Sequence, residues 1–178
     1  HIRKATQGKV ALHNCHPFHR QWHGQDWVFA HNGNLEGTWE LDGPYQPLGD
    51  TDSEAAFCWI LQELDRSGVS PGDGAALHAH LARLSDALAQ RGTFNGLLGK
   101  GHWLLVYATT RLHVLTRQAP FLAARLADDE LSVDFSELAS PTDVVTIVST
   151  EPLTIDEPWQ ALQPGQALWV VGGRVCQG

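Results

Sequence analysis

The sequence predicts an α+β fold, in which a strand, two consecutive helices and then a run of strands follow one another. The strand is expected at residues 27–31, where the apolar run WVFA leads into His31. Apolar residues at helical spacing occupy most of residues 52–91, and strand patterns fill the chain from Gly101 onward. Strands and helices do not alternate, so a βαβ arrangement is not expected. No repeat or linker divides the chain, which predicts one domain over residues 1–178.

The N-terminal third holds that strand between irregular segments. Residues 1–3 alternate in the manner of a strand, whereas residues 9–26 are polar and His-rich without a sustained period, which predicts a loop. After the strand at residues 27–31, the pair Asn32-Gly33 tolerates positive φ and predicts a tight turn. Residues 33–51 are rich in Gly and Pro, and such a long irregular connection often carries function.

Two amphipathic helices are predicted next. Thr51 and Glu54 have the spacing of a capping box at the start of the first helix, and Gly68 ends it. The second helix ends before Gly92. Their apolar stripes are Ala56, Phe57, Ile60, Leu61 and Leu64 in the first and Leu77, Leu81, Leu84 and Leu88 in the second.

The second half of the chain is predicted to be strands. Residues 102–110 and 111–117 follow each other directly and are expected to form a hairpin. Shorter apolar runs at residues 131–135, 143–150 and 166–173 predict three more strands.

Composition restricts the classes of partner. The net charge is −8, the pI is about 5.6, and Lys and Arg do not cluster, so we expect no nucleic-acid partner. No apolar run approaches the roughly 20 residues that span a bilayer, so we expect no membrane insertion. Three scattered Cys and no leader predict a cytoplasmic protein. The oligomeric state stays open, a homo-oligomer included. The chain lacks Met and begins at His1, so we expect residues to precede it in the natural protein.

Three short segments carry a more specific signal, namely HIRKATQG at residues 1–8, HNG at residues 31–33 and GDTDSE at residues 49–54. In this order and at these separations they resemble the glutaminase domain of the class II glutamine amidotransferases, which belong to the N-terminal-nucleophile hydrolases. The segment NCHPF at residues 14–18 resembles the family's NxHP segment, to which we assign structural support.

The likeness continues downstream. Residues 95–110 resemble the family's mid-domain hairpin, and residues 148–171 resemble the stretch that closes such domains. Essentially the whole chain is covered, and the stand-alone bacterial members are the most similar. The resemblance implies a four-layer α/β/β/α sandwich, incomplete at its N-terminus in this chain.

The resemblance also implies a site. Arg3 would bind the substrate carboxylate through its planar guanidinium, and Asp52 would bind the α-ammonium. The Asn32 side-chain amide and the Gly33 backbone N–H would hold the oxyanion that forms on attack. His31 is placed with Arg3 and Asp52 among the substrate-binding residues. The implied substrate is a small molecule, glutamine or another γ-glutamyl compound, and no cofactor or metal is expected.

The nucleophile of this superfamily is an N-terminal Cys whose own α-amine acts as the general base. Cys15 lies in the NxHP-like segment, Cys58 in an apolar helix and Cys176 at the tail, so each is expected to be structural or superficial. We therefore expect the nucleophile to precede His1 and this chain alone to be inactive.

Two other classes remain open. His13, His16, His19 and His23 are spaced by three, three and four residues, as in a helical metal site, although Pro17 interrupts a helix and no HExxH motif occurs. The alternative to an enzyme is a non-catalytic module that binds a γ-glutamyl ligand or a partner.

Overall fold

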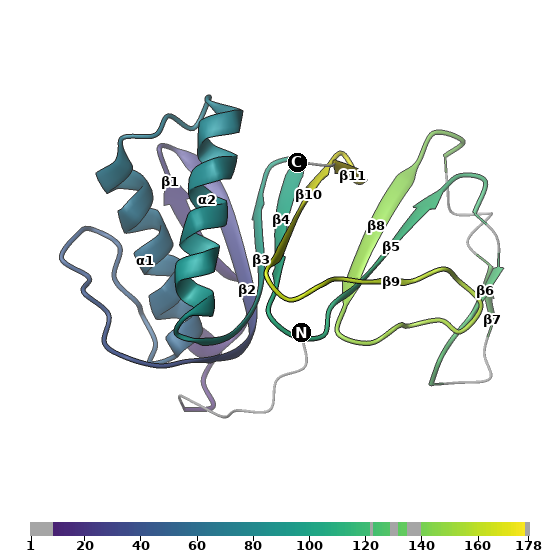
Figure 1. Ribbon diagram of the computed structural model, residues 1–178, viewed down its shortest axis with the longest axis horizontal. Helices are drawn as coiled ribbons and strands as arrows, with labels where there is room; N and C mark the ends of the chain where they lie inside the picture. The colour runs from purple at the N-terminus through teal and green to yellow at the C-terminus, as the bar shows by residue number, and fades with distance from the viewer. Residues whose placement is uncertain (1–8, 122, 129–131, 135–139, 177–178) are drawn as a thin grey trace. The chain divides into compact units, whose positions relative to one another are not determined.

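The computed structural model describes residues 9–121, 123–128, 132–134 and 140–176, and they fall into two compact units (Figure 1). Unit 1 is His1–Gly101 and unit 2 is His102–Gly178. The strand predicted at residues 1–3 lies outside the described residues, and Arg3 with it.

Unit 1 is an antiparallel sheet in the order β1-β2-β3 with two helices on one face, α1 against β2 and α2 against β3 (Figure 1). Its elements are η1 (Leu12–Asn14), β1 (Phe18–Trp22), β2 (Gln25–Leu35), α1 (Asp52–Ser67), α2 (Gly74–Ala89) and β3 (Gly92–Lys100).

The core of unit 1 lies between this sheet and the helices. The Phe29 ring stacks on Phe57 of α1 at a centroid distance of 5.3 Å and on Phe94 of β3 at 6.3 Å. The predicted apolar stripes of both helices are buried. Both helices are therefore confirmed, and Gly68 ends α1 in the left-handed conformation at φ 66°.

The capping box is only half formed. Thr51 Oγ1 accepts the Glu54 N–H at 3.2 Å, as predicted. The Glu54 carboxylate does not return to Thr51 and instead accepts the backbone N–H groups of Leu48 and Gly49. This prediction was wrong because the segment before the helix folds back over the carboxylate and supplies nearer donors.

The loop predicted at residues 9–26 contains β1, which pairs with β2 across a turn at His23 and Gly24. Phe18 and Trp22 are buried, but Arg20 takes the inward position between them. The alternation that would have predicted a strand is broken at that residue.

The turn predicted at Asn32-Gly33 is also wrong. Strand β2 continues through both residues to Leu35, with Asn32 opposite Asn95 and Gly33 opposite Phe94 in β3. Pairing with β3 keeps the backbone extended, so an Asn-Gly pair that would suit a turn lies inside a strand. The irregular connection begins only after Leu35.

Unit 2 contains three sets of antiparallel strands. One is β4 (Trp103–Ala108), β10 (Gln166–Val171) and β11 (Arg174–Cys176). The second has the order β8 (Val144–Ser149), β5 (His113–Gln118) and β9 (Gln160–Ala161), and the third is β6 (Ala123–Arg125) with β7 (Ser132–Asp134).

The hairpin predicted from residues 102–110 and 111–117 does not form. Strand β4 pairs with β10, whereas β5 pairs with β8 and β9. Each finds a partner late in the chain, and adjacency in sequence therefore misled the prediction. Within the described part of the chain, no helix is long and apolar enough to cross a membrane.

Candidate active site

His31 is the buried centre of the HNG segment. Its side chain lies on the face of β2 that α1 covers, and only 3% of the residue is exposed. The ring Nδ1 is 2.9 Å from Ser53 Oγ in α1, and Nε2 is 3.0 Å from the Thr93 carbonyl oxygen in β3. The histidine therefore joins three elements of unit 1 through one side chain.

The protonation state of His31 follows from these partners. Burial lowers its pKa below the usual 6.5, while the Thr93 carbonyl and the nearby Asp52 charge act in the opposite direction. The Thr93 oxygen can only accept, so Nε2 carries the proton and donates to it. Nδ1 then accepts from the Ser53 hydroxyl. The ring is neutral, and both of its nitrogens are used inside the protein.

Gly33 leaves room for this hydrogen bond. A Cβ atom at residue 33 would stand 1.9 Å from the Thr93 oxygen and 2.7 Å from His31 Nε2, where no side chain fits. The glycine thus lets the His31 ring reach across β2 to β3. Its backbone N–H also has no Cβ beside it, so no side-chain atom of residue 33 obstructs approach to that donor.

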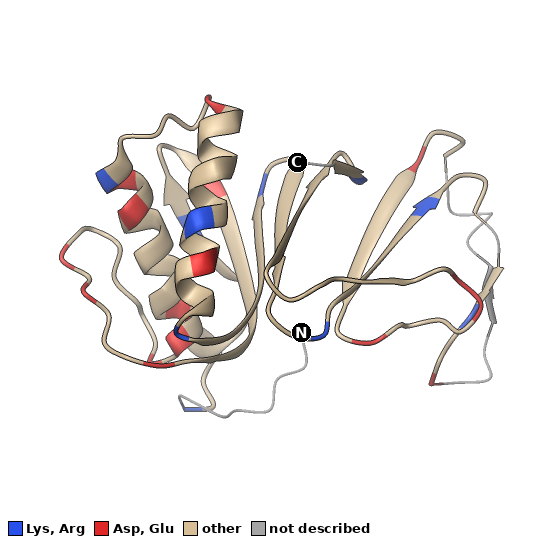
Figure 2. Ribbon diagram, in the orientation of Figure 1, with Lys and Arg blue, Asp and Glu red and all other residues tan. Residues whose placement is uncertain are grey.

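Asp52 is the first residue of α1 and is half-buried. Its Oδ2 accepts the backbone N–H of Leu35 at 2.8 Å, and Oδ1 accepts that of Ser53 at 2.9 Å. The carboxylate thus ties the end of β2 to the start of α1. Figure 2 shows acidic residues at this end of α1, where the helix dipole favours negative charge.

Asn32 lies on the other face of β2, because side chains alternate along a strand. Its side chain is exposed, and its backbone oxygen accepts the Asn95 side chain at 3.2 Å. Asn32 is three residues from Leu35, which is roughly 10 Å along a strand. Because Asp52 bonds the Leu35 N–H, Asn32, Gly33 and Asp52 all lie near the C-terminal end of β2. Arg3, the remaining predicted site residue, lies outside the described residues.

Ser53 and the Thr93 carbonyl were not predicted as parts of the site. Ser53 lies inside the GDTDSE segment, so its position carried a signal that was assigned only to its acidic neighbours. The Thr93 contribution comes from the backbone and leaves no trace in the residue type.

The cysteines differ in reactivity. Burial raises the pKa of the Cys58 thiol to about 11, so it stays protonated at neutral pH and is a poor nucleophile. Cys15 and Cys176 are exposed, and their thiols lie near the backbone oxygens of Ala11 and Arg174. We call the hydrogen-bonded group of His31, Ser53, Asp52, the Thr93 carbonyl and the Leu35 N–H the HNG junction. None of these hydrogen bonds involves a cysteine.

The His-rich segment does not gather into a metal centre. His19 Nε2 lies 2.9 Å from Asp26 and His23 Nε2 lies 3.7 Å from Asp65, each at an exposed position. Across the residues that the structure describes, no group of three His, Cys, Asp or Glu could hold a metal ion.

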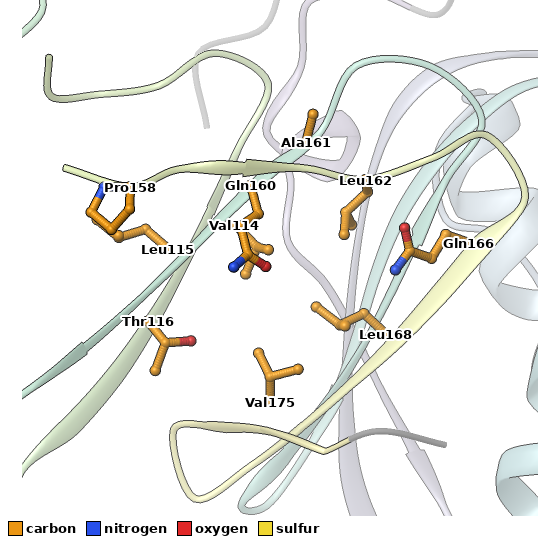
Figure 3. A pocket seen from close by; sticks show the side chains of 10 residues that line it. All are labelled: Val114, Leu115, Thr116, Pro158, Gln160, Ala161, Leu162, Gln166, Leu168 and Val175. Carbon is orange, nitrogen blue, oxygen red and sulfur yellow. The ribbon is translucent and has the colours of Figure 1, made fainter.

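A cavity of about 310 Å³ lies in unit 2 (Figure 3). Most of its lining residues are apolar, among them Leu115, Leu168 and Val175, and Gln160 and Gln166 contribute side-chain amides. All of its lining residues belong to unit 2, and none is a predicted site residue.

Antiparallel strands and two packed helices make this an α+β protein. The family model for class II glutamine amidotransferases matches residues 1–177. The chain therefore belongs to the class II glutamine amidotransferases, and the family resemblance and the α+β fold class are both confirmed. Among the described residues, α1 and α2 form one helical layer of that fold.

Relatives place the chain with the stand-alone bacterial members. It is 47% identical over 178 residues to YafJ of Escherichia coli K12, a provisionally named glutamine amidotransferase, covering 98% of this chain and 70% of YafJ. A Haemophilus influenzae protein with the same provisional name is 41% identical over 175 residues, covering 98% of this chain and 60% of its own length.

Two solved structures of glutamine amidotransferases are also similar to this chain. A crystal structure of a predicted glutamine amidotransferase from Pseudomonas aeruginosa PA01 has a TM-score of 0.84 at 42% identity, covering 94% of this chain and 66% of that one. Glutamine phosphoribosylpyrophosphate amidotransferase from Bacillus subtilis has a TM-score of 0.52 at 14% identity, covering 99% of this chain and 33% of that one, which shows the shared fold alone. The chain thus spans about three fifths to seven tenths of its bacterial relatives.

Proposed function

We propose that the full-length protein hydrolyses the side-chain amide of glutamine, or of another γ-glutamyl compound, and that residues 1–178 form a single amidotransferase domain within it. A cysteine thiolate attacks the γ-carbonyl carbon, and the C–N bond breaks to release ammonia or an amine. The resulting thioester is then hydrolysed by water, which yields the γ-carboxylate and returns the thiol.

Each predicted residue has a role in this scheme. Asn32, through its side-chain amide, and Gly33, through its backbone N–H, stabilise the tetrahedral oxyanion. Asp52 binds the α-ammonium and Arg3 the α-carboxylate. His31, which was grouped with the substrate-binding residues, acts as a positioning residue, because both ring nitrogens already have partners within the protein.

One observation carries the proposal, namely the hydrogen-bonded junction at the end of β2. His31 bonds Ser53 and the Thr93 carbonyl, and Asp52 bonds the Leu35 N–H. These bonds brace the strand that carries Asn32 and Gly33 against the helix that carries Asp52. Preorganised donors of this kind stabilise developing charge without reorganising during the reaction.

The test is steady-state glutaminase kinetics of the full-length protein with Asn32→Ala. Loss of one oxyanion donor costs roughly 10² to 10³ in kcat, which is about 2.7–4 kcal/mol. Asn34→Ala is the matched control, because Asn34 is exposed and lies two residues along the same face of β2. Equal activity of the two variants would refute the role of Asn32.

We further propose that this chain alone does not turn over glutamine, because Cys15, Cys58 and Cys176 do not provide the nucleophile. Replacing all three by Ser in the full-length protein is expected to leave most of its activity. Complete loss of activity would assign the nucleophile to one of them. We also place the protein in the cytoplasm, as its composition predicted, and fractionation of cells tests this.

A further inference from the structure

Two buried polar side chains hold the three residues that lead into the Asp52-bearing helix. Leu48, Gly49 and Asp50 form no regular structure, yet each is hydrogen-bonded to Asn14 or Glu54. Asn14 and Glu54 are each only 1% exposed, so neither is an ordinary surface polar residue. We call Asn14, Glu54 and these three residues the loop clasp.

Glu54 holds the first two residues with both oxygens of its carboxylate. Oε1 accepts the Leu48 N–H at 3.0 Å, and Oε2 accepts the Gly49 N–H at 2.7 Å. Oε1 also accepts the guanidinium of Arg20, which itself donates to the Gln46 oxygen at 3.3 Å. The buried carboxylate of Glu54 is therefore paired with one cation and hydrogen-bonded by two backbone amides, as a buried carboxylate requires.

Asn14 both accepts a hydrogen bond from Asp50 and donates one to it. Its Oδ1 accepts the Asp50 N–H at 3.2 Å, and its Nδ2 donates to Asp50 Oδ1 at 2.6 Å. The same Nδ2 donates to the Lys9 oxygen at 2.8 Å. A side-chain amide can bind one residue in this way because its oxygen accepts while its NH₂ group donates.

Gly49 shows how closely the clasp fits. A Cβ atom at this position would lie 2.0 Å from Asn14 Oδ1 and 3.0 Å from Glu54 Oε2. The backbone therefore passes between the two side chains with no space to spare, and the segment has little freedom to move.

Thr51 and Asp52 follow the clasp directly. Asp52 Oδ2 accepts only the Leu35 N–H among its described contacts, whereas Oδ1 accepts the Ser53 N–H and lies 3.4 Å from the Ser53 hydroxyl. Oδ2 therefore keeps a lone pair for a further donor. We propose that Asn14 and Glu54 are positioning residues that fix this carboxylate for the α-ammonium of the substrate. The inference rests on the proposed function and assigns to the clasp the preference for substrates with a free α-amino group.

The experiment compares two substrates of the full-length protein, glutamine and glutaramate, which is glutamine without its α-amino group. In Asn14→Ala and Glu54→Gln, we expect KM for glutamine to rise roughly tenfold to hundredfold, the range of a hydrogen bond to a charged group. The kcat value should change little, and kcat/KM for glutaramate should stay within about twofold. Glu63→Gln is the control, because Glu63 lies on the same helix and pairs with Arg66, away from the clasp.

The Asp52→Asn variant distinguishes a failure of the proposed substrate-binding role of Asp52 from a failure of the clasp alone. If it leaves the preference for glutamine over glutaramate unchanged, the assigned role of Asp52 fails and this inference with it. If Asp52→Asn removes the preference but Asn14→Ala and Glu54→Gln keep it, only the clasp inference fails.

An equal loss on both substrates would mean that the clasp supports the fold without setting this preference, which also overturns the inference. Should the buried variants not fold, as judged by circular dichroism, Asp50→Ala takes their place. Asp50 is exposed, and this change removes one of the two acceptors of Asn14 Nδ2, leaving the Lys9 oxygen, without touching the core. A selective rise in KM for glutamine is again the supporting result, and an unchanged KM the contrary one.

Discussion

The two units of the chain differ in where they keep their polar side chains. Among the described residues, unit 1 buries eight polar side chains and unit 2 buries one. The single one in unit 2 is Thr154. Those in unit 1 are Asn14, His31, Thr51, Ser53, Glu54, Gln62, Ser85 and Asn95.

This difference shows that unit 1 is where most buried polar side chains are held in place by hydrogen bonds. A buried polar group destabilises a protein unless it is hydrogen-bonded, so a cluster of such groups requires a reason. Four of the eight in unit 1 lie in the HNG junction or the loop clasp, and a fifth, Thr51, caps α1 beside them. Unit 2 instead keeps its Arg117–Glu157 ion pair partly exposed, with 14% and 17% of the side chains accessible.

The largest expected effect comes from breaking one ion pair in each unit. Glu54→Ala leaves Arg20 without its buried partner and removes the acceptor of two backbone N–H groups. We expect a loss of about 3–5 kcal/mol in the free energy of unfolding. Glu157→Ala removes the acceptor of Arg117 at a wetter site and should cost about 1–2 kcal/mol. Urea denaturation of both variants measures the two values.

Equal losses would show that burial does not distinguish these ion pairs, and the contrast between the units would disappear. Glu63→Gln on α1 is the common control, since its pair with Arg66 is superficial and is expected to matter by less than about 1 kcal/mol.

The next effect compares two glycines with positive φ. Gly33→Ala in unit 1 places a Cβ atom 1.9 Å from the Thr93 oxygen, whereas Gly165→Ala in unit 2 meets nothing within 4 Å. Gly165→Ala should therefore cost only the left-handed backbone penalty of about 1–2 kcal/mol. Gly33→Ala should cost about 1–3 kcal/mol more because of the collision. Thermal unfolding of the two variants gives the difference, and no difference would mean that β3 yields to the new atom.

Helices were the most predictable part of the fold. The apolar stripes at Phe57, Leu61 and Leu64 and at Leu77 and Leu81 recur at helical spacing, and local signals at the helix ends do not depend on the rest of the chain. Because these signals are local, α1 begins after Thr51 and ends at Gly68 as predicted.

Strand pairing was harder, because it depends on partners that are distant in sequence. Strand β1 was missed because Arg20 occupies an inward position, and its buried partner Glu54 lies 34 residues away. Asn32 and Gly33 are residue types that favour a turn, but their pairing with β3 keeps both in a strand. Likewise, β4 pairs with β10 rather than with its neighbour in sequence.

In the candidate site, too, one part could be predicted from the sequence and another part could not. The identities of Asn32, Gly33 and Asp52 came from short motifs, which the sequence displays directly. The contacts that hold these residues could not be predicted from motifs, because one partner is the Thr93 carbonyl and another is the backbone N–H of Leu35. A backbone group is common to almost every residue, so no residue pattern indicates which one will be used.

A smaller effect tests the buried histidine by pH. Burial lowers the pKa of His31 in the folded protein below its usual value of 6.5. Below pH 6.5 the unfolded chain therefore binds a proton at His31 more readily than the folded protein does. The stability from His31 is thus complete above pH 6.5 and is lost as the pH falls through the lowered pKa, by at most about 1.4 kcal/mol per pH unit. His31→Gln should flatten this part of the curve of unfolding free energy against pH. An unchanged slope would mean that His31 is protonated as easily in the fold as outside it.

The smallest effect is the counterpart in unit 2 and acts in a different pH range. The hydrogen bond from Arg117 lowers the pKa of Glu157 below its usual 4.5. The folded carboxylate is therefore harder to protonate than the unfolded one, and its stabilisation is complete above about pH 4.5 and is lost as the pH falls through the lowered pKa. Because the pair is partly exposed, Glu157→Gln should change the unfolding free energy at pH 3 by less than about 1 kcal/mol relative to its effect at pH 7. If that change instead exceeds the one that His31→Gln produces between pH 7 and pH 5, the polar group that matters most to acid stability lies in unit 2, and the contrast drawn between the units is wrong.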